Sequence, residues 1–340
     1  RSISSAVTVN GGNCGGGTPC ITALQTNFPV LVSLVSDADL AANALDSGDD
    51  IVFTSADGST QLDHEIESFD GVGSGALVAW VRVPSLPAGT DTTIYLYYGN
   101  GSATNQENPN GVWGANHVGV WHLKEQPTGV PGDMQDSTSR LNHGASQNME
   151  AGDQMAGRID GSVGLDGIDE HIVAGNNAVS FTGQQSHTVS AWIYFDPGQL
   201  TKAEFILEKP ANYWLWWNGD NTFGLGDDVL VFGHENGAGQ DQIVWPWSPS
   251  ADTWYHLVGV HDAIADTNDF ARDLRVTTDN AFCAAEIDND MAKFNPLDDA
   301  GDDFTRTVLK LVILALALGF ADLLDCLLYT SDAADDDTIV

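Results

Sequence analysis

The sequence predicts an all-β protein of two β-sandwich domains, with a short apolar helical segment near the C-terminus. Stretches in which apolar and polar residues alternate recur along the chain, as in HTVSAWIYFDP at 187–197. Many of these stretches carry apolar residues on both faces, which suits strands packed in two layers. The 36 glycines and ten tryptophans in 340 residues agree with this class, because glycine favours turns and aromatic residues favour strands.

The first part of the chain, 1–105, is predicted to form one sandwich domain. Five alternating stretches lie between Asp, Gly and Pro turns: FPVLVSLV (28–35), DIVFTSADG (50–58), LDHEIESF (62–69), GALVAWVRVPSL (75–86) and TTIYLYYGNGSA (92–103). The order and the sequences of these stretches resemble a bacterial domain of unknown function that commonly precedes LamG modules. That architecture also occurs in envelope proteins of the MotA/TolQ/ExbB proton-channel family. The polar segment 106–116 is predicted to be a linker.

The second part, 117–270, is predicted to be a truncated jelly roll. Its phrases are VGVWHL (118–123), DSTSRLNHG (136–144), VGLDGIDEHIVAG (163–175), HTVSAWIYFDP (187–197) and WYHLVGVHD (254–262). In this order they resemble the LamG-type, concanavalin A-like family. The resemblance implies a secreted module that binds a ligand and that is usually not an enzyme. The hairpin that the family has after the last phrase does not match here, which predicts missing closing strands.

The C-terminal part has a different character. Segment 271–325 is unassigned and has the mismatch expected of a frame error or a chimera. Within it, 307–325 is predicted to be an apolar helix, whose eleven uninterrupted apolar residues, Leu311–Ala321, are short of the ~18–20 that a membrane span needs. The phrase CLLYTSDAADD, in the tail 326–340, resembles a translated sequencing adaptor. A start at Arg1, without Met, indicates a metagenomic fragment or a processed chain.

The net charge limits the partners. The chain has 48 acidic and 12 basic residues, a formal charge of −36, and so negative a surface disfavours nucleic acid. Two interpretations remain open: adaptation to a salty medium, or loops that bind Ca²⁺ through carboxylates. The LamG resemblance places such a Ca²⁺ site at Asp136 and at Asp166 or Asp169. Each of these also fits as an ordinary turn residue.

Catalytic motifs are weak. Glu65, Glu67 and Asp70 have the spacing of the carboxylates in retaining glycosidases built on concanavalin-like sheets. Because they alternate with His64 and Ile66, we expect both glutamates to face solvent. The sequence contains no G-x-S-x-G elbow, no H-E-x-x-H motif and no P-loop. We therefore predict no catalytic residues.

Clustered tryptophans are the stronger indication of function. Trp214 and Trp216 are expected on one face of a strand and Trp217 on the other, while Trp245 and Trp247 flank a proline in the same relation. Aromatic rings beside Asn, Asp and Gln suit a carbohydrate site, because apolar sugar faces stack on rings. The same rings could instead fill the core, since one face of each strand must be buried.

These observations predict a non-catalytic module that binds carbohydrate or a cell-surface ligand. The resemblance implies an extracellular, cell-surface or periplasmic setting, in which Cys14 and Cys20 could form a small disulfide. Two alternatives stay open: a glycoside hydrolase of concanavalin-like fold, and the periplasmic part of a proton-channel complex.

Overall fold

A computed structural model shows an all-β chain, as the alternation predicts. It describes residues 3–9, 11–12, 21, 23–174, 181, 185–235 and 240–262, with the backbone of three further strands at 271–278, 312–317 and 329–330. The described residues up to Gly114 form one compact unit, and a second unit begins at Ala115. No helix in the described part of the chain is long and apolar enough to cross a membrane.

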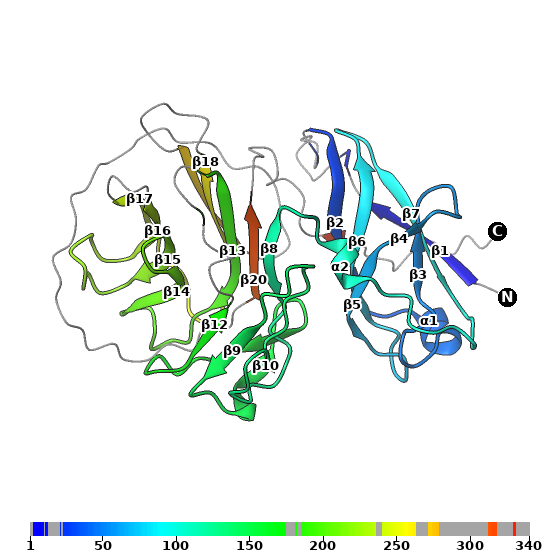
Figure 1. Cartoon of the computed structure of the whole chain (residues 1–340), viewed down its shortest axis with the longest axis horizontal. Helices are drawn as coiled ribbons and strands as arrows, with labels where there is room; N and C mark the ends of the chain where they lie inside the picture. Colours follow the sequence, from blue (N-terminus) through cyan, green and yellow to red (C-terminus); the bar gives the residue numbers. More distant parts are fainter. Residues whose placement is uncertain are drawn as a thin grey trace. The chain divides into compact units, whose positions relative to one another are not determined.

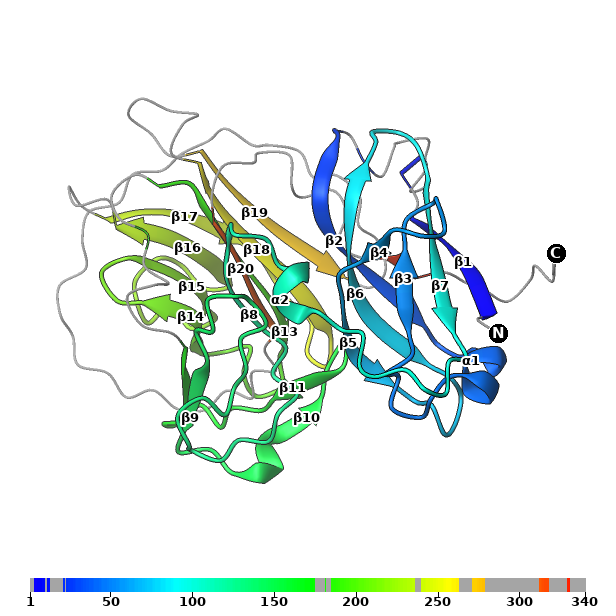
Figure 2. The ribbon, with the colours of Figure 1, turned by 45° about the vertical axis from the view of Figure 1, so that its right-hand side comes forward.

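The first unit is a sandwich of two four-stranded sheets (Figure 2). One sheet has the order β1 (Ile3–Val9), β7 (Thr92–Tyr98), β3 (Val52–Thr54) and β4 (Gln61–Leu62). The other has the order β21 (Tyr329–Thr330), β2 (Gln25–Leu34), β6 (Leu77–Leu86) and β5 (His64–Phe69). Alternate residues of β3, β6 and β7, such as Phe53, Val81 and Leu96, meet in one buried core.

Two short helices complete the first unit. Helix α1 (Ala38–Asn43) begins at Asp37, whose carboxylate accepts the backbone N–H groups of Asp39 and Leu40. Helix α2 (Pro109–Val112) contacts β5 and β6. Because Val112 and Trp113 are buried, part of the segment predicted as a linker belongs to the packed first unit.

The second unit is a sandwich of a five-stranded and a four-stranded sheet (Figure 1). The larger sheet has the order β19 (Ala271–Thr278), β18 (Trp254–Asp262), β13 (His187–Tyr194), β20 (Val312–Ala317) and β8 (His117–Trp121). The smaller has the order β14 (Ala203–Lys209), β15 (Tyr213–Asn218), β16 (Val229–Glu235) and β17 (Gln240–Pro246). Two antiparallel pairs and a 3₁₀ turn lie outside these sheets: β9 (Gly144–Gln147) with β12 (His171–Ala174), β10 (Gln154–Ala156) with β11 (Gly161–Val163), and Ala151–Asp153.

The core of the second unit lies between its two sheets. In β13 the predicted alternation holds, since Ala191 and Ile193 enter this core. Trp192 lies on the other face, where it stacks on His256 at a centroid distance of 5.0 Å. Both faces of this strand are therefore covered.

The prediction of a helix at 307–325 is wrong for six residues of this segment. Val312–Ala317 form strand β20, which pairs antiparallel with β13 and with β8. A short apolar run has no period that separates a buried helix from a buried strand, and here the pairing with two strands decides. Cys14 and Cys20, and most of the tail 326–340, lie outside the described residues.

Candidate functional site

Strand β15 presents tryptophans on both of its faces. Tyr213, Leu215 and Trp217 pack in the core between the two sheets. Trp214 and Trp216 lie on the opposite face of the same sheet, in a separate apolar cluster with Val229 and Val231. This confirms the division of the rings that the alternation predicts. We call this outward side of β14–β17 the aromatic face.

The first row across the aromatic face combines an indole with two polar side chains. Strand pairing sets Glu208 of β14 opposite Trp214, Trp214 opposite Gly233 of β16, and Gly233 opposite Gln242 of β17. A register shift between Phe205 and Leu207 brings Glu208 to this face, because an extra residue reverses the alternation. The row therefore reads carboxylate, indole, glycine, amide.

Gly233 makes room for the indole of Trp214. A Cβ atom built on Gly233 would overlap three ring atoms of Trp214, namely Cε2, Nε1 and Cζ2. The indole therefore covers the backbone of β16, where any side chain would displace it. Trp214 is half-buried in this position, so part of its ring stays accessible.

The second row is apolar and supports the first. It consists of Phe205, Trp216, Val231 and Val244, in that order across the four strands. Phe205 stacks on Trp216 with a centroid distance of 5.6 Å and an interplanar angle of 23°. Phe223, from the loop between β15 and β16, meets Trp216 edge-on at 4.6 Å. Trp216 is therefore buried beneath its neighbours, whereas Phe205 is 38% exposed.

The indole N–H groups on this face are not used in hydrogen bonds among the described residues, and Trp214 is the one of the two side chains that is not fully buried. Within the described residues neither Trp214 nor Trp216 donates a hydrogen bond from Nε1. An indole N–H is a donor only, so a ligand hydroxyl could accept from it. The face thus offers apolar ring surface, a donor, a carboxylate and an amide.

The remaining tryptophans of the predicted site lie on the core side of the sheet. Trp217 is fully buried and donates from Nε1 to the carbonyl of Leu200 at 3.4 Å. This corrects its assignment as a ligand-contacting ring. Trp247 packs against the same core, edge-on to Tyr255 at 4.9 Å. Trp245 is 37% exposed but pairs with Leu230, which belongs to the core face.

Asp136 does not fit a Ca²⁺ site. Its Oδ1 accepts the backbone N–H groups of Val120 and Thr138, each at 2.9 Å. Its Oδ2 accepts from the hydroxyl of Thr138 at 2.8 Å and the backbone N–H of Asn142 at 2.7 Å. Four donors occupy a carboxylate that is 3% exposed, so Asp136 organises the turn.

Asp166 and Asp169 lie together in another turn. The carboxylate of Asp166 accepts the backbone N–H of Ile168 at 2.8 Å. Burial, together with the charges of Asp153, Asp166 and Asp169, raises the pKa of Glu170. Among the described residues, no three His, Cys, Asp or Glu side chains are arranged to hold a metal ion. Ca²⁺ at this turn therefore stays a prediction.

The expectation that Glu65 and Glu67 face solvent is wrong. Both are buried, at 7% and 4% exposure. Glu65 Oε2 accepts the indole N–H of Trp113 at 2.8 Å, and Glu67 Oε2 accepts that of Trp80 at 2.6 Å. Trp113 follows α2 and covers this face from far along the chain, which local alternation cannot reveal. The pairing gives both carboxylates a structural role.

Phe205, Glu208 and Gln242 were missed by the sequence analysis. Phe205 and Glu208 are three residues apart, a spacing that alternation assigns to opposite faces. Only the bulge in β14 brings them together, and no residue pattern marks it. Gly233 within the alternating VLVFGHE was the available signal, since glycine inside a strand often marks a close approach.

Comparisons with known proteins give a partial match and distant likenesses. A family model described as "Domain of unknown function (DUF2341)" matches residues 47–119. No curated protein matches the chain.

Three solved structures illustrate the distant likenesses. The binding domain of Paraclostridial Mosquitocidal Protein 1 is 16% identical over 61% of this chain and 51% of its own, with a TM-score of 0.37. The receptor binding domain of botulinum neurotoxin mosaic serotype C/D is 10% identical over 60% and 48%, with a TM-score of 0.36. Domain 4 of AbnA, an extracellular arabinanase from Geobacillus stearothermophilus solved with arabinotriose, is 18% identical over 56% and 91%, with a TM-score of 0.29. The chain spans about half the length of the first two, and at these scores no argument about function follows.

Proposed function

We propose that the second unit binds carbohydrate on its aromatic face, with Trp214 as the ring on which a sugar stacks. The observation that carries this proposal is the row in which the indole of Trp214 covers Gly233 between Glu208 and Gln242. The rings of Phe205, Trp216 and Phe223 pack in one cluster on the same face, beside this row.

The chemistry of this row suits a sugar. A pyranose or furanose ring has an apolar C–H side, which packs on an aromatic ring, and hydroxyls at its rim. The carboxylate of Glu208 accepts hydrogen bonds, and the amide of Gln242 both donates and accepts them. The indole N–H of Trp214 adds one donor.

The negative charge of the chain favours a neutral polysaccharide over an anionic one as the ligand. At a formal charge of −36, the protein repels uronate or sulfated chains at moderate ionic strength. The LamG resemblance of the five sequence phrases supports a binding module, and on the same ground we place the protein outside the cytoplasm.

The test compares two tryptophans of one sheet. Wild type, Trp214→Ala and Trp245→Ala are measured for retention on cellulose, xylan, mannan and arabinan, with alginate as an anionic reference. Trp245 is the matched control, because it is more exposed than Trp214 but lies on the core side of the sheet. Loss of one stacked ring removes about 1–2 kcal/mol of binding, roughly five- to thirtyfold in affinity. Equal effects of both substitutions, or retention of alginate alone, would contradict the proposal.

A further inference from the structure

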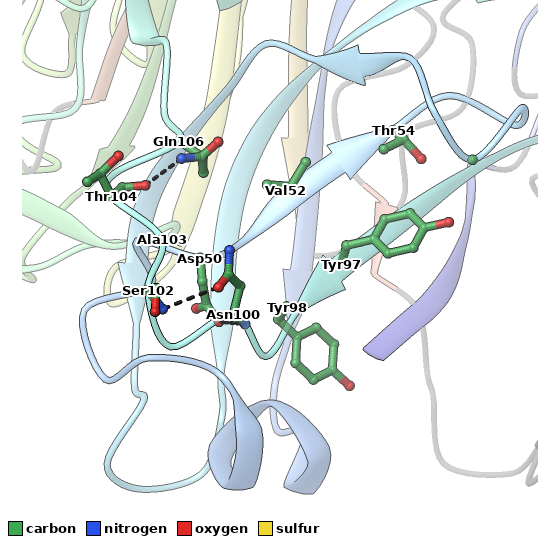
Figure 3. Close-up of a pocket in the computed structure, with 11 residues that line it drawn as sticks. Asp50, Val52, Thr54, Tyr97, Tyr98, Asn100, Ser102, Ala103, Thr104 and Gln106 are labelled. Carbon is green, nitrogen blue, oxygen red and sulfur yellow. Dashed lines mark hydrogen bonds between the residues drawn. The ribbon is translucent and has the colours of Figure 1, made fainter. Parts of the chain in front are cut away.

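The first unit contains a pocket of its own, on the side of its β1–β7–β3–β4 sheet that faces away from the core (Figure 3). Its volume is about 540 Å³, within the range of roughly 300–1,000 Å³ typical of small-ligand sites. Residues from β3, β7 and the loop after β7 line it, chiefly Val52, Thr54, Tyr97, Asn100, Ser102 and Gln106. The pocket lies within the residues that the DUF2341 model matches.

The floor of the pocket is an aromatic and aliphatic pair. Strand pairing sets Val52 directly opposite Tyr97, and both are half-buried. Core residues Phe53 and Leu96 alternate with them and hold the sheet from the other side. The ring of Tyr97 is therefore fixed at its base and reachable from the pocket.

The rim is polar and uncharged. Asn100, Ser102 and Thr104 are exposed, and Gln106 is half-buried. The loop holds its own shape: the backbone N–H of Ser102 donates to Asn100 Oδ1 at 3.2 Å, and Gln106 Nε2 donates to the carbonyl of Thr104 at 2.5 Å. Hydroxyls and amides at the rim both donate and accept.

The single charged residue among those that line the pocket is already engaged. Asp50 is buried, and its Oδ2 accepts the backbone N–H groups of Gly99 and Asn100 at 2.7 and 2.9 Å. Its Oδ1 accepts the N–H of Leu45 at 2.8 Å. A charged ligand would lose its hydration without gaining a counter-charge, whereas a neutral hydroxylated ligand would not.

We propose that this pocket is a second carbohydrate site, which takes a short neutral saccharide with one sugar ring on Tyr97 and its hydroxyls on the Asn100–Gln106 loop. The inference goes beyond the aromatic face and does not depend on it, because the two sites belong to different units. A chain with both sites would bind a polysaccharide with greater avidity than either site gives alone.

The experiment uses the full chain carrying Trp214→Ala, which removes the stacking ring of the aromatic face. Isothermal titration measures binding of the tetrasaccharides of cellulose, xylan, mannan and arabinan, with trigalacturonate as the charged control. We expect at least one neutral saccharide to bind and trigalacturonate not to bind. Adding Tyr97→Ala should weaken that binding about tenfold or more.

Tyr95→Ala is the matched control. Tyr95 lies two residues away on the same side of β7, 6.5 Å from Tyr97 between ring centroids, and does not line the pocket. If Tyr97→Ala disturbs folding, Ser102→Trp decides the matter by filling the pocket from an exposed position. The inference is overturned if the Trp214→Ala chain binds none of the neutral saccharides, if Tyr95→Ala and Tyr97→Ala weaken binding equally, or if a folded Ser102→Trp chain binds normally. None of these results affects the comparison of Trp214 with Trp245.

Discussion

The two units treat tryptophans on the outward sides of their sheets in different ways. In the first unit, Trp80 and Trp113 lie 5.2 Å apart between centroids, and each donates its indole N–H to a buried glutamate. In the second unit, Trp216 makes ring contacts with Phe205 and Phe223, and Trp214 packs against the same apolar cluster. Within the described residues, neither indole N–H donates a hydrogen bond. Similar residues therefore form a closed structural element in one unit and an available surface in the other.

The two units also differ in how their buried glutamates are hydrogen-bonded. Glu67 in the first unit is bonded to an indole. Glu204 in the second unit pairs across strands with Trp217, but that indole donates to the carbonyl of Leu200 instead. Within the described residues Glu204 Oε1 has no hydrogen-bond partner. A tryptophan on the neighbouring strand therefore satisfies a buried carboxylate oxygen in the first unit and leaves one unsatisfied in the second.

The largest expected effect concerns Glu204. Burial raises the pKa of Glu204 from 4.5 to about 8, a shift opposed by Lys202 and reinforced by Asp220. Between these values the folded state keeps a proton that the unfolded chain has released. The contribution of Glu204 to the free energy of unfolding should therefore fall as pH rises from about 4.5 to 8, by several kcal/mol at ~1.4 kcal/mol per pKa unit. The fall should be steepest between about pH 6.5 and 8, where His256 no longer opposes it. Glu204→Gln should remove this slope in denaturant titrations.

His256 provides the internal control for that titration. Burial lowers the pKa of His256 from 6.5 to about 4, so the unfolded chain binds its proton first as pH falls. The free energy of unfolding therefore decreases as pH falls from about 6.5 to 4, and this decrease should be the same in Glu204→Gln as in wild type. If the free energy of unfolding of Glu204→Gln still falls as pH rises to about 8, as in wild type, the carboxylate of Glu204 is ionised in the folded state.

A smaller effect is expected at Glu67. Glu67→Ala leaves the buried N–H of Trp80 without its acceptor and should destabilise the first unit by about 2–3 kcal/mol. Glu67→Gln keeps an acceptor oxygen and should cost less. Urea unfolding followed by tryptophan fluorescence measures both. If Glu67→Ala unfolds at the same urea concentration as wild type, Glu67 faces solvent, as the alternation predicts.

The smallest effect is expected at Gly233, where an added side chain would overlap the indole of Trp214. Gly233→Ala should displace the indole of Trp214 and weaken neutral polysaccharide binding about fivefold, roughly 1 kcal/mol, with little change in unfolding. Gly198→Ala, where an added Cβ meets open space, is the control. Unaltered binding in Gly233→Ala would mean that the position of the Trp214 ring is unimportant to the ligand.

The sequence predicted the sandwich architecture and the faces of β15, because both follow from alternation over a few residues. It did not predict the burial of Glu65 and Glu67, since Trp113 bonds to Glu65 from nearly fifty residues away and Trp80 bonds to Glu67 from the neighbouring strand. The place of Glu208 depends on a bulge, and the strand at Val312–Ala317 depends on pairing with β13 and β8. Each of these is a non-local or irregular feature that periodicity does not contain.

The most direct test of the account follows the indole N–H signals of the ¹⁵N-labelled full chain by NMR. The chain is titrated with the oligosaccharide of whichever neutral polysaccharide retains it. We predict that the Trp214 signal, assigned through Trp214→Phe, shifts most and that of Trp216 less. The signals of Trp80 and Trp113 should stay in place, because glutamates already hold their N–H groups. Shifts confined to Trp80 and Trp113, with Trp214 unmoved, would contradict the assignment of the aromatic face as the carbohydrate site.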